Sequence, residues 1–247
     1  MKRVAENQDR AQAARNQFIY QQKTRRTLRR KDGKLLREEF WTFDMIPKAD
    51  GTEKRFVSVK GRYLKKGQYL PFEGKPVPEV SILNVTLDDN DNDGDATTRD
   101  AIDRDLFPLT TEEQKKYTFE LVGETTIQER PAYQIHFHPT NRREFAWTGE
   151  AVIDKEEFQP VRVYTQLSRK LPVAVRTVLG TNVSGLGFNI QYKRVDQNLW
   201  FPSTYGTEFG LHVLFLLDRT ITESMENTDF RRTTANSQIK YETEKDQ

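Results

Sequence analysis

Several runs of this sequence have apolar and polar residues in alternation, and that period of two is typical of β-strands with one buried face. The run FIYQQKTRRTLRR meets KLLREEFWTFDMI through Asp32-Gly33, a dipeptide that favours tight hairpin turns. Asp50-Gly51 then leads into KRFVSVKGRYL. Three alternating runs joined by short turns predict an antiparallel meander.

The alternation returns after residue 115 in five further runs, which are YTFELVG, PAYQIHFHP, WTGEAVID, QPVRVYTQL and GFNIQYKRV. The segment LWFPSTYGTEFGLHVLFLLDRTITE, residues 199–223, is the most apolar of all and is predicted as one long strand. Residues 171–183, LPVAVRTVLGTNV, are apolar without strict alternation, so a short helix and a flap both fit them. Residues 3–16 have helical spacing of apolar positions and no Gly or Pro, which predicts an N-terminal helix.

These elements predict a mainly β fold. Long antiparallel strands with one apolar face must curl or be covered, so we expect a strongly curved antiparallel sheet, a half-open barrel, with the N-terminal helix and short helices or loops as a lid. The domain prediction is one β domain over residues 1–230 with a loop-rich insert at about 67–115. The polar residues 231–247 are predicted to form a flexible tail.

Composition excludes several functional classes. The chain has no cysteine, which removes thiol catalysis, disulfides and cysteine-based zinc sites. Hydrolase signatures such as G-x-S-x-G and H-E-x-x-H are absent from the sequence, and we expect no enzymatic activity. The net charge of +2 gives no general attraction to nucleic acid. The basic run at 23–31 has no interleaved aromatic residues, so a solvated strand explains it better than a nucleic-acid site; contact with anionic lipid headgroups is left open.

The order of the elements resembles a known superfamily. Three features carry the resemblance: a strand ending at Pro139, the segment TGEAVIDKEEFQPVRV, and the hairpin before Trp200-Phe201-Pro202. Together with the N-terminal helix and the insert, they are similar to the outer-membrane lipoprotein-sorting superfamily, which contains the periplasmic lipoprotein carrier. The similarity spans about residues 5–225 and is one of pattern and order.

The resemblance implies an unclosed barrel whose apolar cavity receives acyl chains, and therefore a lipid or lipoprotein carrier in the periplasm or cell envelope. The first 17 residues lack the apolar run of a signal peptide. The expected partners are an acyl-chain lipid or a lipidated protein, with peripheral membrane contact left open and no nucleic acid. No cofactor is expected beyond the calcium ion considered below.

An apolar cavity of this kind needs apolar walls and a lid. We predict walls from the alternating strands and lid contacts from the 171–183 segment. The predicted cavity residues are Trp147, Val161, Val163, Phe209, Leu211, Val213, Phe215, Leu217, Val175 and Leu179. The alternative is that these side chains fill a closed core, in which case the protein would serve as an interaction or scaffold protein.

The insert contains LDDNDNDGDATTRD, whose acidic residues follow the spacing of a calcium-binding loop. The candidate ligands are Asp89, Asp91, Asp93, Asp95 and Asp100. The preceding VSILNVTL is β-rich, which excludes a true EF-hand with flanking helices. A lone calcium loop that orders the insert and a low-complexity turn region both remain as interpretations.

His136 and His138 lie two apart and project from one face of their predicted strand. Two imidazoles at this spacing can bind zinc if a carboxylate such as Glu150 completes the site. A solvated outer face explains the pair with fewer assumptions, and it is the interpretation we favour.

Overall fold

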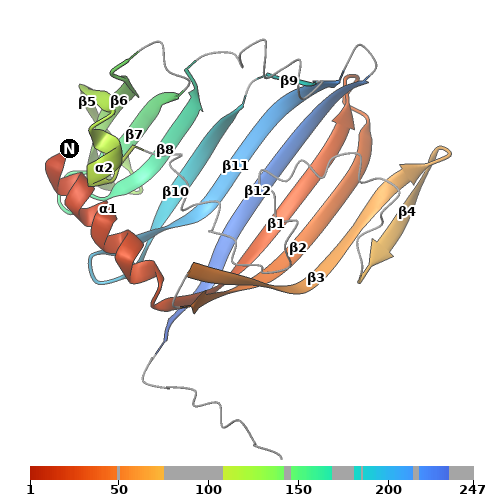
Figure 1. Cartoon of the computed structure of the whole chain (residues 1–247), viewed down its shortest axis with the longest axis horizontal. Coiled ribbons are helices and arrows are strands. Elements are labelled where there is room, and N and C mark those ends of the chain that lie inside the picture. The colour runs from red at the N-terminus through yellow and green to blue at the C-terminus, as the bar shows by residue number, and fades with distance from the viewer. Residues whose placement is uncertain are drawn as a thin grey trace, which may run out of the picture.

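The computed structural model describes residues 1–48, 51–74, 108–141, 146–168, 181–184, 186–213 and 217–233. Within them, twelve strands form a single sheet in which every pairing is antiparallel (Figure 1). The strands are β1 (Phe18–Arg30), β2 (Leu35–Lys48), β3 (Gly51–Lys65), β4 (Gln68–Glu73), β5 (Tyr117–Ile127), β6 (Arg130–Pro139), β7 (Trp147–Asp154), β8 (Pro160–Leu167), β9 (Thr181–Ser184), β10 (Gly187–Asp196), β11 (Leu199–Val213) and β12 (Leu217–Arg232).

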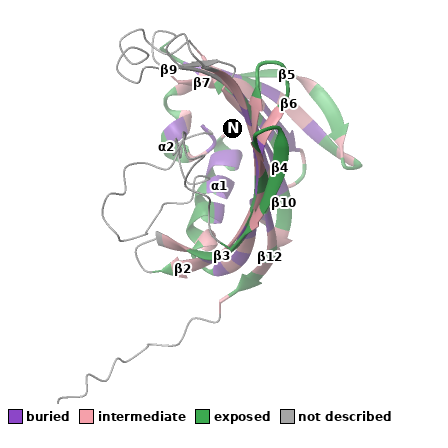
Figure 2. Cartoon of the chain, turned by 90° about the vertical axis from the view of Figure 1, so that its right-hand side faces the viewer, coloured by how far each residue is buried: buried purple, intermediate pink, exposed green. Residues whose placement is uncertain are grey.

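The sheet has the order β4-β3-β2-β1-β12-β11-β10-β8-β7-β6-β5, and β9 pairs with β11 beside this path. Within the described residues β4 and β5 are its two edges, so the sheet does not close into a barrel. It is strongly curved, and helices α1 (Lys2–Arg15) and α2 (Thr111–Gln114) both lie on its concave side (Figure 2). The predicted fold class is confirmed.

Most strands lie where the alternation predicts them. The first turn has Gly33 at φ +80°, a conformation that glycine adopts without steric cost, and the Asp32 carboxylate accepts a hydrogen bond from the Lys34 amide at 3.0 Å. β4 lies within the segment that was expected to be loop-rich, so the strands continue to Glu73. β9 occupies the end of the 171–183 segment, and residues 171–180 lie outside the described part of the chain.

The prediction of one strand over residues 199–223 is wrong. The structure divides this segment between β11 and β12, which pair antiparallel with Val213 opposite Leu217. The intervening sequence, Leu-Phe-Leu, contains no Gly, Pro, Asn or Asp, so the usual signal of a turn is missing. β12 then extends to Arg232, beyond the point where the composition becomes polar.

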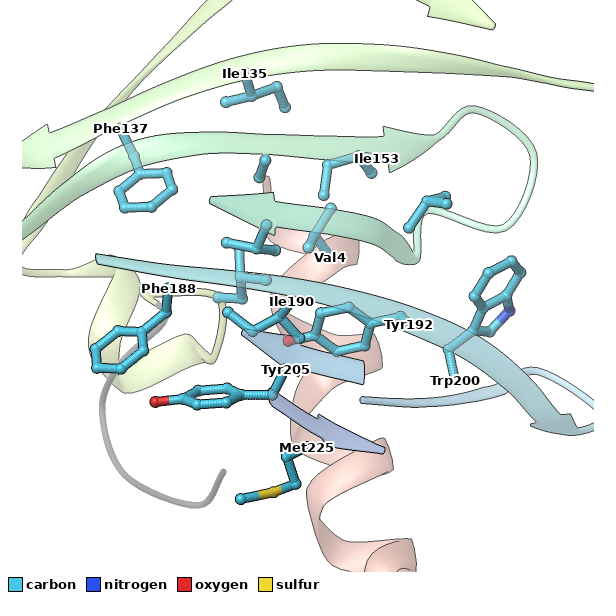
Figure 3. Packing of buried hydrophobic residues seen from close by; sticks show 14 residues of the cluster. Val4, Ile135, Phe137, Ile153, Phe188, Ile190, Tyr192, Trp200, Tyr205 and Met225 are labelled. Carbon is cyan, nitrogen blue, oxygen red and sulfur yellow. The ribbon is translucent and has the colours of Figure 1, made fainter. Parts of the chain in front are cut away.

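The main core lies between the sheet and α1 (Figure 3). Val4 of α1 and Leu109 pack against inward-facing residues of six strands. The buried strand residues of this cluster are Ile135, Phe137, Ala151, Ile153, Val161, Val163, Phe188, Ile190, Tyr192, Trp200, Tyr205 and Met225. A second cluster joins Ala11 of α1 to Phe18 and Phe201, whose rings meet edge to face at 5.1 Å. Among the described helices none is long and apolar enough to span a bilayer.

Polar contacts fix α1 at the turn between β7 and β8. The Asn7 side chain donates to the carbonyls of Glu157 and Phe158 at 2.8 and 3.0 Å. The Gln8 amide donates to the Gln159 side chain at 3.2 Å, and both residues are buried. The Arg3 guanidinium lies 3.8 Å from the centre of the Phe158 ring. The helix is therefore held by directional contacts as well as by its apolar face.

The same turn is organised by Asp154, which is fully buried. Its carboxylate accepts two hydrogen bonds from Arg130, at 2.6 and 3.1 Å, and further ones from the amides of Glu156 and Glu157. Burial alone would raise the pKa of Asp154, but these donors outweigh it and hold that pKa below its usual value. The segment "ID…QPV" that carried the superfamily resemblance is thus the hairpin on which α1 rests.

Candidate functional site

The concave face of the sheet carries both helices and the core, and the strand register shows which residues form it. Directly paired residues point to the same side of a sheet. One row therefore crosses nine strands on the concave face. From β6 to β3 its members are Ile135, Ala151, Val163, Ile190, Tyr205, Met225, Thr24, Trp41 and Val59.

This face has two parts that differ in chemistry. We call the part on β5–β8, β10 and β11 the helix-covered half, because α1 crosses it (Figure 1). The part on β12 and β1–β4 is called the aromatic half. Val161 and Val163 in the helix-covered half have relative exposures of 1% and 0%, and they belong to the cluster that includes Val4. Here the protein's own side chains occupy the concavity.

The aromatic half carries a group of rings. Trp41 and Phe43 on β2 stack with centroids 5.9 Å apart and planes inclined by 3°. Phe56 on β3 meets them edge-on at 6.2 and 6.1 Å, and it is 46% exposed. The Lys54 ammonium lies 4.4 Å from the centre of the Phe43 ring. We call Trp41, Phe43 and Phe56 the aromatic platform.

A second group of rings continues toward the edge strand. The Phe72 ring on β4 lies 6.2 Å from Tyr63 and 5.3 Å from the Arg37 guanidinium. A Cβ atom at Gly61, which pairs with Phe72, would come within 2.8 Å of that ring. The same Cβ would come even closer to the backbone oxygen of Glu38, so Gly61 lets β2 and Phe72 pack closely against β3. Apolar rings thus line the concave side of the aromatic half as far as its edge.

A polar band crosses the same half one row away from Trp41. Arg26 on β1 donates to Glu223 on β12 at 2.7 Å, and their side chains are 33% and 17% exposed. Arg37 is paired with Glu39 on β2, and the Trp41 indole donates to the same Glu39 carboxylate at 3.2 Å. Arg26 stands directly opposite Glu39 in the strand register. Each guanidinium of the band is therefore matched by a carboxylate.

Two threonines flank the Arg26–Glu223 pair. Thr207 on β11 is paired with Glu223, and Thr24 lies two residues before Arg26 on β1. Their side chains are 6% and 7% exposed, and neither hydroxyl has a hydrogen-bond partner within the described residues. A buried hydroxyl without a partner costs about 1–3 kcal/mol. Thr27 and Thr165 are buried without a partner in the same way, so this feature is not confined to the polar band.

The structure places four of the predicted cavity residues in apolar clusters. Val161, Val163 and the partly buried Trp147 belong to the main core, and Trp147 packs edge to face on Phe188 at 5.1 Å. Phe209 is buried with Ile221 and Leu28 in a small third cluster. Leu211 and Val213 lie on β11 and Leu217 begins β12, while Val175, Leu179 and Phe215 lie outside the described residues.

The predicted metal ligands have two outcomes. Asp89, Asp91, Asp93, Asp95 and Asp100 lie outside the described residues, so calcium binding stays a prediction. In the described part of the chain, no group of three or more His, Asp or Glu side chains could hold a metal ion.

The two histidines lie on the convex face, as the solvated interpretation expects. His136 Nε2 lies 3.3 Å from the Glu150 carboxylate, and His138 Nε2 lies 3.7 Å from that of Glu120. Each imidazole therefore faces a different carboxylate.

The sequence predicted a strand over KLLREEFWTFDMI, but Trp41 and Phe43 were not selected as site residues. Phe56 was missed as well. The available signal was Trp-Thr-Phe, in which two large aromatic residues stand two positions apart and therefore on the same face of a strand.

Comparison with known proteins returns no matching family model and no matching curated protein. Solved structures do match. A putative outer-membrane lipoprotein-sorting protein domain from Vibrio parahaemolyticus has 10% identity and a TM-score of 0.39, with 95% of this chain and 94% of that chain covered. A LolA superfamily protein from Nitrosomonas europaea has 10% identity and a TM-score of 0.35, with coverage of 93% and 92%.

Another match is MucB in the Pseudomonas aeruginosa MucA/MucB complex, with 13% identity, a TM-score of 0.26, and coverage of 94% of this chain and 99% of that chain. The resemblance drawn from the sequence is confirmed to this extent: solved structures that match include lipoprotein-sorting and LolA superfamily proteins. At these identities and scores the matches carry no argument about the ligand.

Proposed function

We propose that this protein is a non-enzymatic binding protein of the bacterial cell envelope that holds the acyl chain of a lipid or of a lipidated protein on the concave face of its sheet. The observation that carries the proposal is the aromatic platform. Trp41, Phe43 and Phe56 lie on the same face as the core, yet Phe56 is almost half exposed. Apolar rings gathered on the inner side of a curved sheet are suited to covering an alkyl chain.

The division of the concave face supports this position for the ligand. The helix-covered half is filled by Val4, Leu109 and the strand side chains around them. The aromatic half offers rings from β2, β3 and β4. An acyl chain laid there would contribute about 0.8 kcal/mol for each methylene removed from water. The envelope location is proposed from the superfamily resemblance of the sequence.

Native mass spectrometry of protein purified from a bacterial host, before and after organic extraction, tests the proposal. We expect an additional mass of fatty-acid or phospholipid size that extraction removes. The variant Phe56→Glu places a charge on the platform and should abolish the adduct. Phe40→Glu is the matched control, because Phe40 is 40% exposed on the convex face of β2. Wild-type protein that remains free of lipid after incubation with it would overturn the proposal.

A second candidate function follows from the filled helix-covered half. A sheet that already has a closed core under α1 can act as an interaction or scaffold protein, with the acidic loop at residues 89–100 ordered by calcium. This alternative predicts that the melting temperature rises on addition of calcium and falls with a chelator, while lipid has no effect. The carrier proposal predicts a rise with lipid.

A further inference from the structure

The convex side of the aromatic half carries exposed aromatic rings among its cations. Phe40 on β2 and Tyr69 on β4 are 40% and 43% exposed. The Arg25 guanidinium lies 5.8 Å from the centre of the Phe40 ring, and the Arg62 guanidinium lies 5.4 Å from that of Tyr69. Both described helices lie on the opposite side of the sheet, so neither of them covers these groups (Figure 2).

Cross-strand pairing gathers these side chains from four strands. Arg25 on β1 pairs with Phe40, which in turn pairs with Lys60 on β3. Lys23 and Lys60 are both exposed. The basic run at 23–31 has no aromatic residue of its own, and β2 and β4 supply the rings beside it. We call this group the basic face; its members are Lys23, Arg25, Phe40, Lys60, Arg62 and Tyr69.

A carboxylate beneath the basic face orders its two arginines. Glu38 accepts hydrogen bonds from Arg25 at 2.7 and 3.1 Å and from Arg62 at 2.9 Å. Its side chain is 8% exposed, whereas each arginine side chain is 52% exposed. A guanidinium has five N–H donors, so each arginine keeps donors for an anion outside the protein. The face therefore presents positive charge to solvent.

We infer that the basic face docks this protein on the surface of an anionic lipid bilayer. The guanidiniums and ammoniums would contact phospholipid phosphates, and the two rings would lie at the boundary between head groups and acyl chains. Rings that are partly exposed beside cations suit that boundary, where one end of a side chain is apolar and the other is wet. The face lies opposite the aromatic platform, so the inference goes beyond the proposed function.

The borders of the basic face favour a bilayer over nucleic acid. Glu226 on β12 stands opposite Lys23 in the strand register. Glu73 on β4 stands opposite Lys60. Carboxylates thus limit the positive surface on both sides, whereas nucleic-acid binding requires a broad or continuous basic patch. A bilayer supplies many phosphates around one small contact and an apolar layer for the rings.

Sedimentation of the full chain with vesicles tests the inference. We expect binding to vesicles of phosphatidylcholine and phosphatidylglycerol in equal parts, weakening as salt is added, and none to phosphatidylcholine alone. Lys23→Gln/Lys60→Gln should bind the mixed vesicles about fivefold more weakly for each charge removed. Phe40→Ser should weaken binding at every salt concentration, because it removes a ring and no charge. Melting temperatures verify that each variant is folded.

The helix-covered half offers a matched control. Arg162 on β8 is next to Val163 of the concave row, so it points to the convex side, and it is 45% exposed. Arg162→Gln removes one cation from the same side of the sheet and should bind the mixed vesicles like the wild type. Phe56→Glu should also dock normally, although it is expected to lose the acyl adduct.

The outcomes separate docking from the proposed function. Wild-type protein that binds both kinds of vesicle equally, or neither, would overturn the inference. Equal weakening by Arg162→Gln would overturn the assignment to the basic face. Binding to polyglutamate without binding to vesicles would assign the face to an acidic protein segment instead. Wild-type protein that docks as expected but never carries lipid would contradict the proposed function and support this inference.

Discussion

The helix-covered half and the aromatic half belong to one sheet and share one concave face, yet they differ in how far that face is buried. In the first, the row through Ala151, Val163 and Ile190 is made of small and branched apolar residues. They leave room for α1 to pack closely. In the second, the same row continues through Thr24 and Trp41, and the next row is charged. The ion pairs of that charged row leave the aromatic half without the continuous apolar surface on which α1 packs.

A filled core and a partly exposed face are thus built from the strands of one sheet, and they differ in where the polar side chains stand. The helix-covered half has its polar contacts at the rim, where Asn7 and Asp154 fix the helix and its hairpin. The aromatic half has polar groups in the middle of the face, at Arg26 and Glu223. The first arrangement favours stability, and the second favours recognition of a ligand with a polar end.

Replacing one phenylalanine in each half should give the largest difference. Phe137→Ala removes a fully buried ring that contacts Tyr117 and Phe119, and we expect a loss of about 4 kcal/mol in the free energy of unfolding. Phe56→Ala in the aromatic half should cost less than about 1 kcal/mol, because Phe56 is half exposed. Urea unfolding measures both. Equal losses would mean that the platform is part of the core.

The next largest difference is expected in how much an ion pair of each half contributes to stability. Asp154→Ala removes the buried acceptor of two turn amides and leaves Arg130 with only Glu156 and Glu157, so we expect a loss of about 3 kcal/mol. Asp44→Ala breaks the exposed Arg55–Asp44 pair on the convex side of the aromatic half, and little stability should be lost. Thermal unfolding of the two variants compares them. A large effect at Asp44 would contradict the view that stability is concentrated around α1.

Acid should weaken the helix-covered half through Asp154. The folded state holds the pKa of Asp154 below its usual value. Its contribution is therefore complete above the unfolded pKa of about 4 and is lost as the pH falls through the lower folded value. Asp154→Asn should be less stable at neutral pH and should show a shallower decline of stability below pH about 4. Glu38→Gln is the comparison, since the pKa of Glu38 is also lowered but its partners Arg25 and Arg62 are half exposed.

How far the sequence predicts these features depends on how local their causes are. Alternation shows where β1, β6 and β8 lie, because residues two positions apart on a strand face the same side and so share the same polarity. The reversal between Val213 and Leu217 was missed because its residues carry no turn signal. The pairing of β1 with β12 joins segments about 200 residues apart, and no local pattern reports it. The polar band has the same limit, since Arg26 of β1 and Glu223 of β12 become partners only through this pairing.

The smallest expected effect concerns the ion pair of the polar band, and it decides whether that band serves stability or recognition. Glu223→Leu alone leaves Arg26 without its carboxylate and should cost about 1 kcal/mol. The double variant Arg26→Met/Glu223→Leu replaces the pair with apolar side chains of similar length. We expect it to unfold at the same urea concentration as the wild type or higher, because such replacements are often neutral or stabilising.

The double variant should lose ligand selectivity although it keeps its stability. The double variant keeps the aromatic platform, so it should still bind palmitate, but it should no longer distinguish palmitate from monopalmitoylglycerol, because the charged groups of the band are gone. Titration of both ligands into wild type and variant measures the preference. A double variant that is much less stable than the wild type and equally selective would show that the band holds the sheet together. The aromatic half would then be a second core, and the distinction between the two halves would fail.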